Sequence, residues 1–92
     1  MTPMSEVQVQ HNSREQRFEI HLDGHLAFLQ YEQKDGEIDI VHTEVPKALG
    51  SRGLGGLLAK EALQWARQQT GQRLVVRCPF VREYLRKHPD GQ

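Results

Sequence analysis

The stretch that decides the fold runs from Ile38 to Gly56 and reads IDIVHTEVPKALGSRGLGG. Residues 38–45 are rich in β-branched side chains, and the run stops at Pro46, which has no backbone N–H for a sheet ladder. Glycines follow, and an apolar pattern with a helical period begins at Leu54. The stretch therefore predicts a strand, a glycine-rich loop and a helix in succession.

The apolar phase shifts by one residue within this predicted strand. Ile38 and Ile40 fall on one face of an alternating strand, whereas Val41 and Val45 fall on the other. A β-bulge near residues 40–41 accounts for the shift, because it inserts one extra residue and re-aims the strand. A strand buried on both faces accounts for it equally well, so the sequence leaves both interpretations open.

Three short strands with turn signals between them are expected ahead of this stretch. Strict alternation of apolar and polar residues over residues 18–22 is typical of a half-buried strand. Asp23 and Gly24 then form a dipeptide typical of a two-residue hairpin turn, in which both residues must tolerate positive φ. The predicted set is a short strand at Val7 and Val9, strands at residues 18–22 and 27–33, and a second turn at residues 34–37.

The segments after the glycine-rich loop complete the pattern. An apolar stripe with helical spacing runs from Leu54 through Trp65, and Gly71 is expected to end the helix. A buried strand at residues 74–76 and a short helix at residues 81–88 follow. The order strand-strand-strand-strand-helix-strand-helix predicts an α+β fold with a mixed, mainly antiparallel sheet, and its last strand-helix-strand unit is expected to be a right-handed crossover.

The length of the chain allows one hydrophobic core only, so residues 1–92 are expected to form a single domain, with residues 1–6 flexible. Hydrophobic residues make up 37% and charged residues 26%, which is ordinary for a folded globular domain. No apolar run approaches the roughly 20 residues of a membrane span, and residues 1–10 lack the core of a signal peptide. We therefore expect a cytoplasmic protein, and the single cysteine, Cys78, excludes an intrachain disulfide.

Charge divides unevenly along the chain although the net charge is zero. Residues 1–46 carry nine acidic and three basic side chains, and residues 47–92 carry nine basic and three acidic ones. One region of the folded protein is therefore able to attract an anion and another a cation. The alternative is that the charges only keep two surfaces soluble.

The loop at residues 51–56 has the sequence SRGLGG and precedes the predicted helix. Glycines let the backbone turn tightly and point several N–H groups into one concavity at the positive end of a helix dipole. Arg52 adds a mobile positive charge. The loop favours phosphate binding, although close packing alone also selects glycine. It matches neither the Walker loop nor the dinucleotide fingerprint, which indicates a nucleotide-bearing cofactor other than ATP or NAD.

Motifs on both sides of this loop are recognisable as a set. They are His42-Thr43-Glu44-Val45-Pro46, then Arg52-Gly53-Leu54-Gly55, and then Cys78-Pro79-Phe80-Val81 ahead of Tyr84 and His88-Pro89. Together, over about residues 18–89, they resemble the small YjdJ-type members of the GNAT superfamily of N-acetyltransferases. The resemblance implies a compact GNAT-like α+β fold with acetyl-CoA bound between the fourth and fifth strands. In the superfamily loop pattern, Gln/Arg-x-x-Gly-x-Gly/Ala, Gly50 stands where Gln or Arg is usual.

The resemblance also implies a set of cofactor-binding residues. The backbone N–H groups of the glycine-rich loop are expected to hold the pyrophosphate of coenzyme A. The backbone of the fourth strand is expected to pair with the pantetheine arm. A bulge in this strand would then serve to separate the fourth and fifth strands, which would otherwise pair with each other. The implied cofactor-binding residues are Thr43, Val45, Ser51, Arg52, Gly53, Leu54, Gly55 and Gly56.

Acetyl transfer to an amine needs a base, a polarised thioester carbonyl and a way to discharge the thiolate. Glu44 or His42 is the candidate base, acting directly or through water. The resemblance implies that a backbone N–H near Val45 polarises the carbonyl. Tyr84 resembles the tyrosine that protonates the CoA thiolate in larger relatives, and a packing aromatic is the alternative. Cys78 is either a nucleophile that carries the acetyl group or a small buried hydrophobe.

The predicted function is an acetyl-CoA-dependent N-acetyltransferase that acts on a primary amine, such as a protein lysine or N-terminus, by direct attack in a ternary complex. The alternative is an acyl-CoA-binding sensor or interaction module with little or no catalysis. Nucleic-acid binding is weaker still, because the basic residues near the C-terminus have no aromatic stacking platform beside them. His11, His21 and His25 show no ligand spacing, so we predict no metal.

Overall fold

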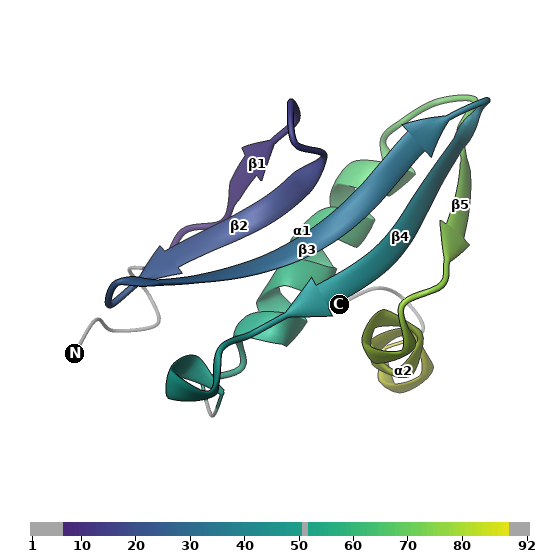
Figure 1. Ribbon diagram of the computed structural model, residues 1–92. Helices are drawn as coiled ribbons and strands as arrows, with labels where there is room; N and C mark the ends of the chain where they lie inside the picture. Colours follow the sequence, from purple (N-terminus) through teal and green to yellow (C-terminus); the bar gives the residue numbers. More distant parts are fainter. Residues whose placement is uncertain (1–6, 51, 89–92) are drawn as a thin grey trace.

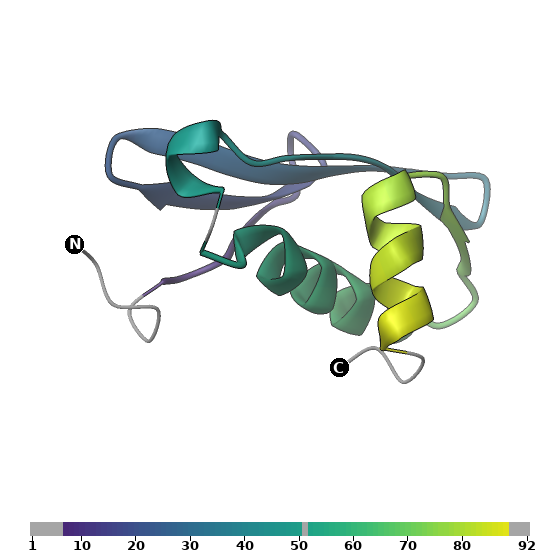
Figure 2. The same cartoon turned by 90° about the horizontal axis from the view of Figure 1, so that it is seen from below.

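The computed structural model describes residues 7–50 and 52–88. The expected flexibility of residues 1–6 and the predicted site residue Ser51 lie outside the described residues. The described chain forms one sheet with both helices on the same face, so that the other face of the sheet carries no helix (Figure 1, Figure 2). The mixed α+β architecture predicted from the sequence is confirmed.

The sheet has five strands in the order β1-β2-β3-β4-β5. Each pair from β1 to β4 is antiparallel, whereas β4 and β5 are parallel. A short 3-10 helix, which the sequence did not indicate, lies between β4 and α1. The elements are β1 (Gln10–Asn12), β2 (Arg17–Leu22), β3 (His25–Lys34), β4 (Glu37–Glu44), η2 (Lys47–Leu49), α1 (Leu54–Arg67), β5 (Arg73–Val76) and α2 (Pro79–Lys87).

The first strand lies later in the chain than the valines indicated. Val7 and Val9 are partly buried against the core, but the strand itself is Gln10–Asn12. Its position is fixed by antiparallel pairing with β2, in which Gln10 faces Glu19 across the sheet, and by a side-chain hydrogen bond of 3.1 Å from Asn12 to the Glu19 carboxylate. The position of the strand was decided by its pairing with β2, which cannot be deduced from the apolar pattern of one strand alone.

Both predicted hairpin turns are confirmed. Asp23 has φ 53° and Gly24 has φ 77°, and the same two values recur at Asp35 and Gly36. Positive φ at both central residues matches the right-handed twist of the flanking strands and holds the two hairpins tightly closed.

The helix boundaries differ from the expected ones by a few residues. Helix α1 ends at Arg67, ahead of Gly71, whose φ of 80° serves the turn into β5 instead. Helix α2 begins at Pro79 rather than Val81. Proline is favoured at the first helical position because its fixed φ suits the helix and its missing N–H has no partner there.

Val41 is a β-bulge in β4. Tyr31 of β3 faces Ile40 and the preceding Gln30 faces His42, so that Val41 has no partner of its own on β3. The shift in apolar phase therefore reflects an inserted residue, as one of the two sequence interpretations predicted, and not a strand buried on both faces.

The core lies between the sheet and the two helices. It is built from alternate residues of β2, β3 and β4 and from the inward stripe of α1. Trp65, which the sequence placed in the core, is partly buried at its edge. The fully buried large side chains are Tyr31, Ile20, Leu29, Ile38, Ile40, Leu49, Leu54, Leu58, Leu63 and Val81.

His11 joins β1 to this core through aromatic contacts. Its ring stacks on Phe18 with centroids 4.2 Å apart, meets the edge of Trp65 at 4.7 Å, and lies with Nε2 2.5 Å from the hydroxyl of Tyr31. Burial against these rings lowers the pKa of His11 and raises the pKa of Tyr31. The neutral imidazole is therefore the form that the folded protein favours.

A pH-dependent stability follows from His11. The pKa of His11 is lower in the folded protein than its unfolded value of about 6.5. The contribution of His11 to the free energy of unfolding is therefore fully present above the unfolded pKa and is lost as the pH falls through the folded pKa. We expect the urea midpoint of the wild type to fall more steeply between about pH 7.5 and pH 5 than that of His11→Phe, which keeps the stacking without the titration. Equal slopes for the two proteins would contradict this role.

Candidate functional site

The parallel ladder between β4 and β5 ends abruptly at Ile40. Its carbonyl accepts two hydrogen bonds, from the N–H of Arg77 at 2.9 Å and from the N–H of Cys78 at 3.1 Å. The last register pair is Ile40 with Val76, but β4 continues to Glu44. Beyond this point no strand of the described part pairs with β4 on that side, because β5 ends at Val76 while β4 runs on (Figure 1). We call this unpaired edge of β4 the opening.

The bulge decides which side chains face this opening. Ile40 lies on the helix-covered face, so unbroken alternation would also put His42 and Glu44 there. With Val41 inserted, His42 and Glu44 lie on the helix-free face, and Thr43 takes the covered face opposite the buried Leu29. The inserted Val41 therefore turns the hydroxyl of Thr43 toward the helices and turns the candidate bases, His42 and Glu44, away from them.

A cleft of about 260 Å³ lies on the covered face beside the opening. It brings together the end of β4 and the start of α1, and no residue of β5 lines it. It includes most of the predicted cofactor-binding residues, but Arg52 does not line it. The lining residues are Thr43, Val45, Gly50, Gly53, Leu54, Gly55, Gly56 and Phe80.

The start of α1 supplies backbone donors to this cleft. Gly53 precedes the helix with φ 74°, and its carbonyl accepts the N–H of Leu57 at 3.2 Å. Among residues 7–50 and 52–88, no side chain caps the helix. Helical geometry leaves the N–H groups of Leu54, Gly55 and Gly56 without a partner inside the helix, and the dipole makes this end positive. The arrangement suits an anion.

Arg52 differs from the sequence expectation. Its guanidinium donates to the Asp23 carboxylate at 2.7 Å, with only 21% of the side chain exposed, so the charge is held and not mobile. Its backbone N–H donates to the Leu49 carbonyl at 3.2 Å and is already engaged. The residue pins the loop to the turn between β2 and β3 because Asp23 lies within reach of it. Ser51, beside it, lies outside the described residues.

Phe80 borders the cleft from α2 and was quoted above only as part of a motif, without a role in the site. Its ring is 46% exposed and packs against Gly55, where an added Cβ would meet the ring at 2.7 Å. The available signal was a large apolar residue following a proline at a helix start. A second cleft of about 220 Å³ shares Gly56 and Phe80 with the first and is lined by Gly56, Phe80, Glu83, Tyr84, Lys87 and His88.

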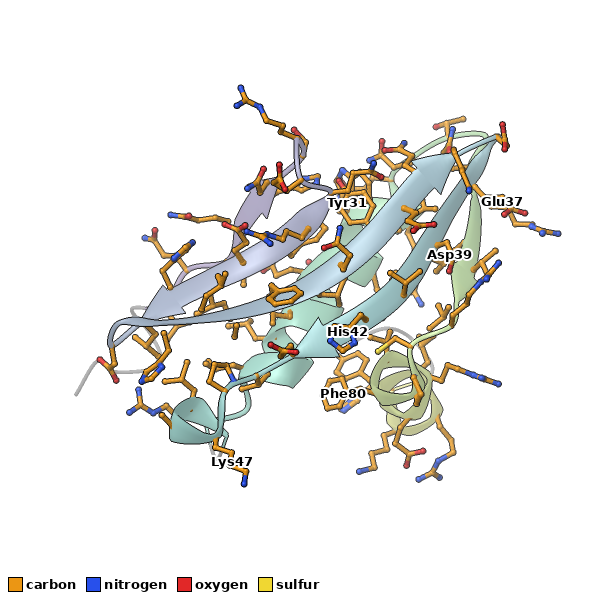
Figure 3. The ribbon with its side chains drawn as sticks, in the orientation of Figure 1. Tyr31, Glu37, Asp39, His42, Lys47 and Phe80 are labelled. Atoms are coloured by element: carbon orange, nitrogen blue, oxygen red, sulfur yellow. The ribbon has the colours of Figure 1, made fainter. Side chains whose placement is uncertain are left out.

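Tyr84 belongs to the second cleft and does not line the first. Its ring stacks on His88 with centroids 4.5 Å apart, and an atom of the ring would lie 3.8 Å from a Cβ at Gly56. The predicted thiolate acid and the predicted pantetheine residues therefore line two clefts that share Gly56 and Phe80. Figure 3 shows Phe80 near the start of α2.

Cys78 lies behind the first cleft. Its thiol is 3% exposed, lines neither of the two clefts described and donates to the hydroxyl of Thr43 at 3.4 Å. This contact crosses the opening between β4 and the chain that follows β5. The thiol packs as a small buried group. Thr43, its hydrogen-bond partner, lines the first cleft, whereas the thiol does not.

His42 and Glu44 form a pair on the helix-free face. Their Nε2 and Oε1 atoms are 3.3 Å apart, and the two side chains are 57% and 61% exposed. Figure 3 shows His42 on the terminal part of β4, where that strand runs on beside the start of α2. The pair is able to accept a proton from the solvent side of the opening, because both side chains are open to water.

Residues 17–92 match the family of GCN5-related N-acetyltransferases. The chain belongs to this family. It is also similar to Protein NATD1 from Xenopus tropicalis, with 30% identity over 97% of this chain and 84% of the relative. Protein NATD1 from Bos taurus is 34% identical, and the human protein 33% identical, each over 90% of this chain and 75% of the relative. GCN5-related N-acetyltransferases use acetyl-CoA, which the resemblance had implied.

Over residues 7–50 and 52–88, no cluster of three or more His, Cys, Asp or Glu side chains is arranged to hold a metal ion. No helix in the same ranges is long and apolar enough to cross a membrane. His21, one of the histidines considered above, lies 3.1 Å from the Glu19 carboxylate.

The packing of Phe80 on Gly55 predicts a contrast between two alanine substitutions. Gly56→Ala has room for its Cβ and is expected to raise the free energy of unfolding by roughly 0.5–1 kcal/mol, the usual preference of a helix for alanine. Gly55→Ala must displace the Phe80 ring and is expected to gain less or to destabilise. Urea unfolding measures both, and Phe80→Ala should restore the gain at position 55. Equal effects at the two glycines would contradict the contact.

Proposed function

We propose that the protein is a compact YjdJ-type acetyltransferase that uses acetyl-CoA to acetylate a primary amine, such as a protein lysine or N-terminus. One observation carries the proposal. The cleft beside the opening combines a free strand edge with the uncapped start of α1, which are the two surfaces that an amide-containing arm and a pyrophosphate require. Membership of the family supports the same assignment.

The pyrophosphate is assigned to the start of α1. The N–H groups of Leu54, Gly55 and Gly56 are oriented by the helix, and Gly53 adds backbone that approaches without a side chain. Arg52 acts indirectly, because its ion pair with Asp23 holds the loop in place. The predicted contribution of Ser51 is kept as part of this proposal.

The pantetheine arm is assigned to the edge of β4 at residues 43–45. Because β5 ends at Val76, this edge has no strand partner in the described chain, and an arm containing two amides is able to pair with it as a strand would. Thr43 and Val45 line the cleft on the same side. The nucleotide end continues past Phe80 into the second cleft, where Lys87 offers a positive charge and Tyr84 an aromatic ring.

The chemistry is proposed to be direct attack in a ternary complex. The amine nitrogen forms a bond to the thioester carbon, the carbon–sulfur bond breaks, and the departing thiolate takes up, directly or through water, the proton that the nitrogen loses. Glu44 or His42 takes the amine proton, directly or through water, and the N–H near Val45 polarises the carbonyl. The predicted role of Tyr84 as thiolate acid stays a prediction. Its place in the second cleft favours contact with the nucleotide instead.

Binding of the cofactor is testable with a substitution that separates affinity from stability. Gly56→Asp puts a negative charge at the start of α1, where it favours the helix dipole but repels a pyrophosphate. We expect calorimetry to show at least about a ten-fold loss of acetyl-CoA affinity, with a melting temperature equal to or above that of the wild type.

The neutral isostere Gly56→Asn is the matched control and should retain most of the affinity. Equal affinities for the aspartate and asparagine variants would contradict the assignment of the pyrophosphate. A wild-type protein that binds no acetyl-CoA at millimolar concentration would overturn the proposed function as a whole.

Catalysis is tested separately from binding. Release of CoA thiol in the presence of a panel of primary amines identifies an enzyme, whereas binding without release on any amine favours the sensor. Because the thiol of Cys78 is buried, we expect Cys78→Ala to keep transfer within about three-fold of the wild type, and rapid-quench mass spectrometry to find Cys78 unmodified. An acetylated Cys78 that forms and decays at the turnover rate would establish the covalent route instead.

A further inference from the structure

The helix-free face of the sheet carries an aromatic side chain between two carboxylates. Phe28 of β3 is partly buried, and its direct cross-strand neighbours are Glu19 of β2 and Glu44 of β4. Figure 2 shows both helices on the other side of the sheet, so neither covers this row. A phenyl ring flanked by negative charge on an open surface is a favourable place for a cation.

One cationic side chain, that of Arg17, already lies against the Phe28 ring. The guanidinium carbon of Arg17 lies 5.4 Å from the centroid of the Phe28 ring, and the same guanidinium is paired with the Glu19 carboxylate. Burial acts to raise the pKa of Glu19, but hydrogen bonds from Arg17, His21 and Asn12 outweigh it and the pKa is lowered. Glu19 is therefore an anion that holds Arg17 on the β2 side of the ring.

The β4 side of the ring has no such resident charge. The ring of His42 is tilted toward Phe28 with centroids 6.0 Å apart, and His42 provides the ion-pair contact of Glu44 in the described chain. No Lys or Arg of residues 7–50 and 52–88 is recorded within ion-pair distance of Glu44, whose side chain is 61% exposed. The β4 side thus offers a carboxylate and an aromatic ring with no fixed cation between them.

We infer that Phe28, His42 and Glu44 form the acceptor patch, which receives the alkylammonium group of the amine substrate. The inference rests on the proposed function and names the acceptor class: a primary amine on an alkyl chain, cationic at neutral pH, as in a lysine side chain. Phe28 acts as a specificity-determining residue. It favours the ammonium group through its ring and the alkyl chain through its apolar surface.

The position of the acceptor patch agrees with the chemistry. Its two polar members lie on the part of β4 that extends beyond the last β5 pair, so a bound amine is delivered next to the opening. The cofactor cleft lies on the opposite face of the same strand segment. The ammonium group must lose one proton before it attacks, and Glu44 or His42 is adjacent to receive it.

Binding of a small amine tests the acceptor patch without requiring catalysis. We would titrate the wild-type protein with n-butylamine and, separately, with n-butanol, and follow the amide and aromatic signals by two-dimensional NMR. We expect saturable shifts for Phe28, His42 and Glu44 with the amine and much smaller ones with the alcohol. Equal responses to the two compounds, or amine shifts confined to other parts of the protein, would overturn the inference.

Variants identify the residues responsible. Phe28→Leu and Glu44→Gln should each weaken butylamine binding by about five-fold, whereas Phe28→Tyr should retain it because the ring is kept. Glu32→Gln is the matched control, since it removes one exposed carboxylate from the same face of β3 farther from the opening. Unchanged affinity in Phe28→Leu, with the fold verified by its NMR spectrum, would overturn the role of the ring.

The same samples distinguish this inference from the proposed function. For a lysine-containing peptide, Phe28→Leu should raise KM by about five-fold and leave acetyl-CoA affinity unchanged. A protein that binds acetyl-CoA but shows no preference for amine over alcohol overturns the acceptor patch alone. A protein that binds no acetyl-CoA overturns the proposed function, whatever the response to the amine.

Discussion

The hydrogen bonding of one carbonyl group, that of Ile40, constrains the whole functional region. It accepts the N–H groups of both Arg77 and Cys78, which ends the parallel ladder, and the next residue of β4, Val41, is the bulge. A carbonyl oxygen has two lone pairs, so both donors are satisfied while the chain turns away from β4. The parallel ladder therefore ends without leaving either N–H group unpaired, and the edge of β4 has no strand partner in the described chain beyond this point.

The bulge and the free edge act together on the chemistry of the surface. The inserted Val41 turns Thr43 to the covered face, where it meets Cys78 and lines the cleft beside the start of α1, and turns His42 and Glu44 to the open face. Three residues thus divide between the two sides of a single strand. Without the insertion the candidate bases would point into the core, where a charged side chain without a partner is costly.

Much of this arrangement could be predicted from the sequence because it depends on local signals. The Asp-Gly dipeptides predicted the two hairpins, and the phase change at Val41 indicated either a bulge or a strand buried on both faces, between which the pairing with β3 decides. Contacts between distant segments were not accessible in this way. The ion pair that fixes Arg52 depends on Asp23 of a turn far away in the chain, and the contact of Phe28 with Arg17 depends on the register between two strands.

A free strand edge inside a small sheet is normally a liability, because it is a template for pairing with another chain. Here the liability is limited in three ways: the free segment is only a few residues long, it ends at Pro46, and it is followed at once by η2. The loop and α1 then return along the covered face. A short edge protected in this manner is too small to recruit another strand but long enough to pair with an extended ligand containing a few amides. The features that keep the edge from aggregating are thus compatible with the binding role proposed for it.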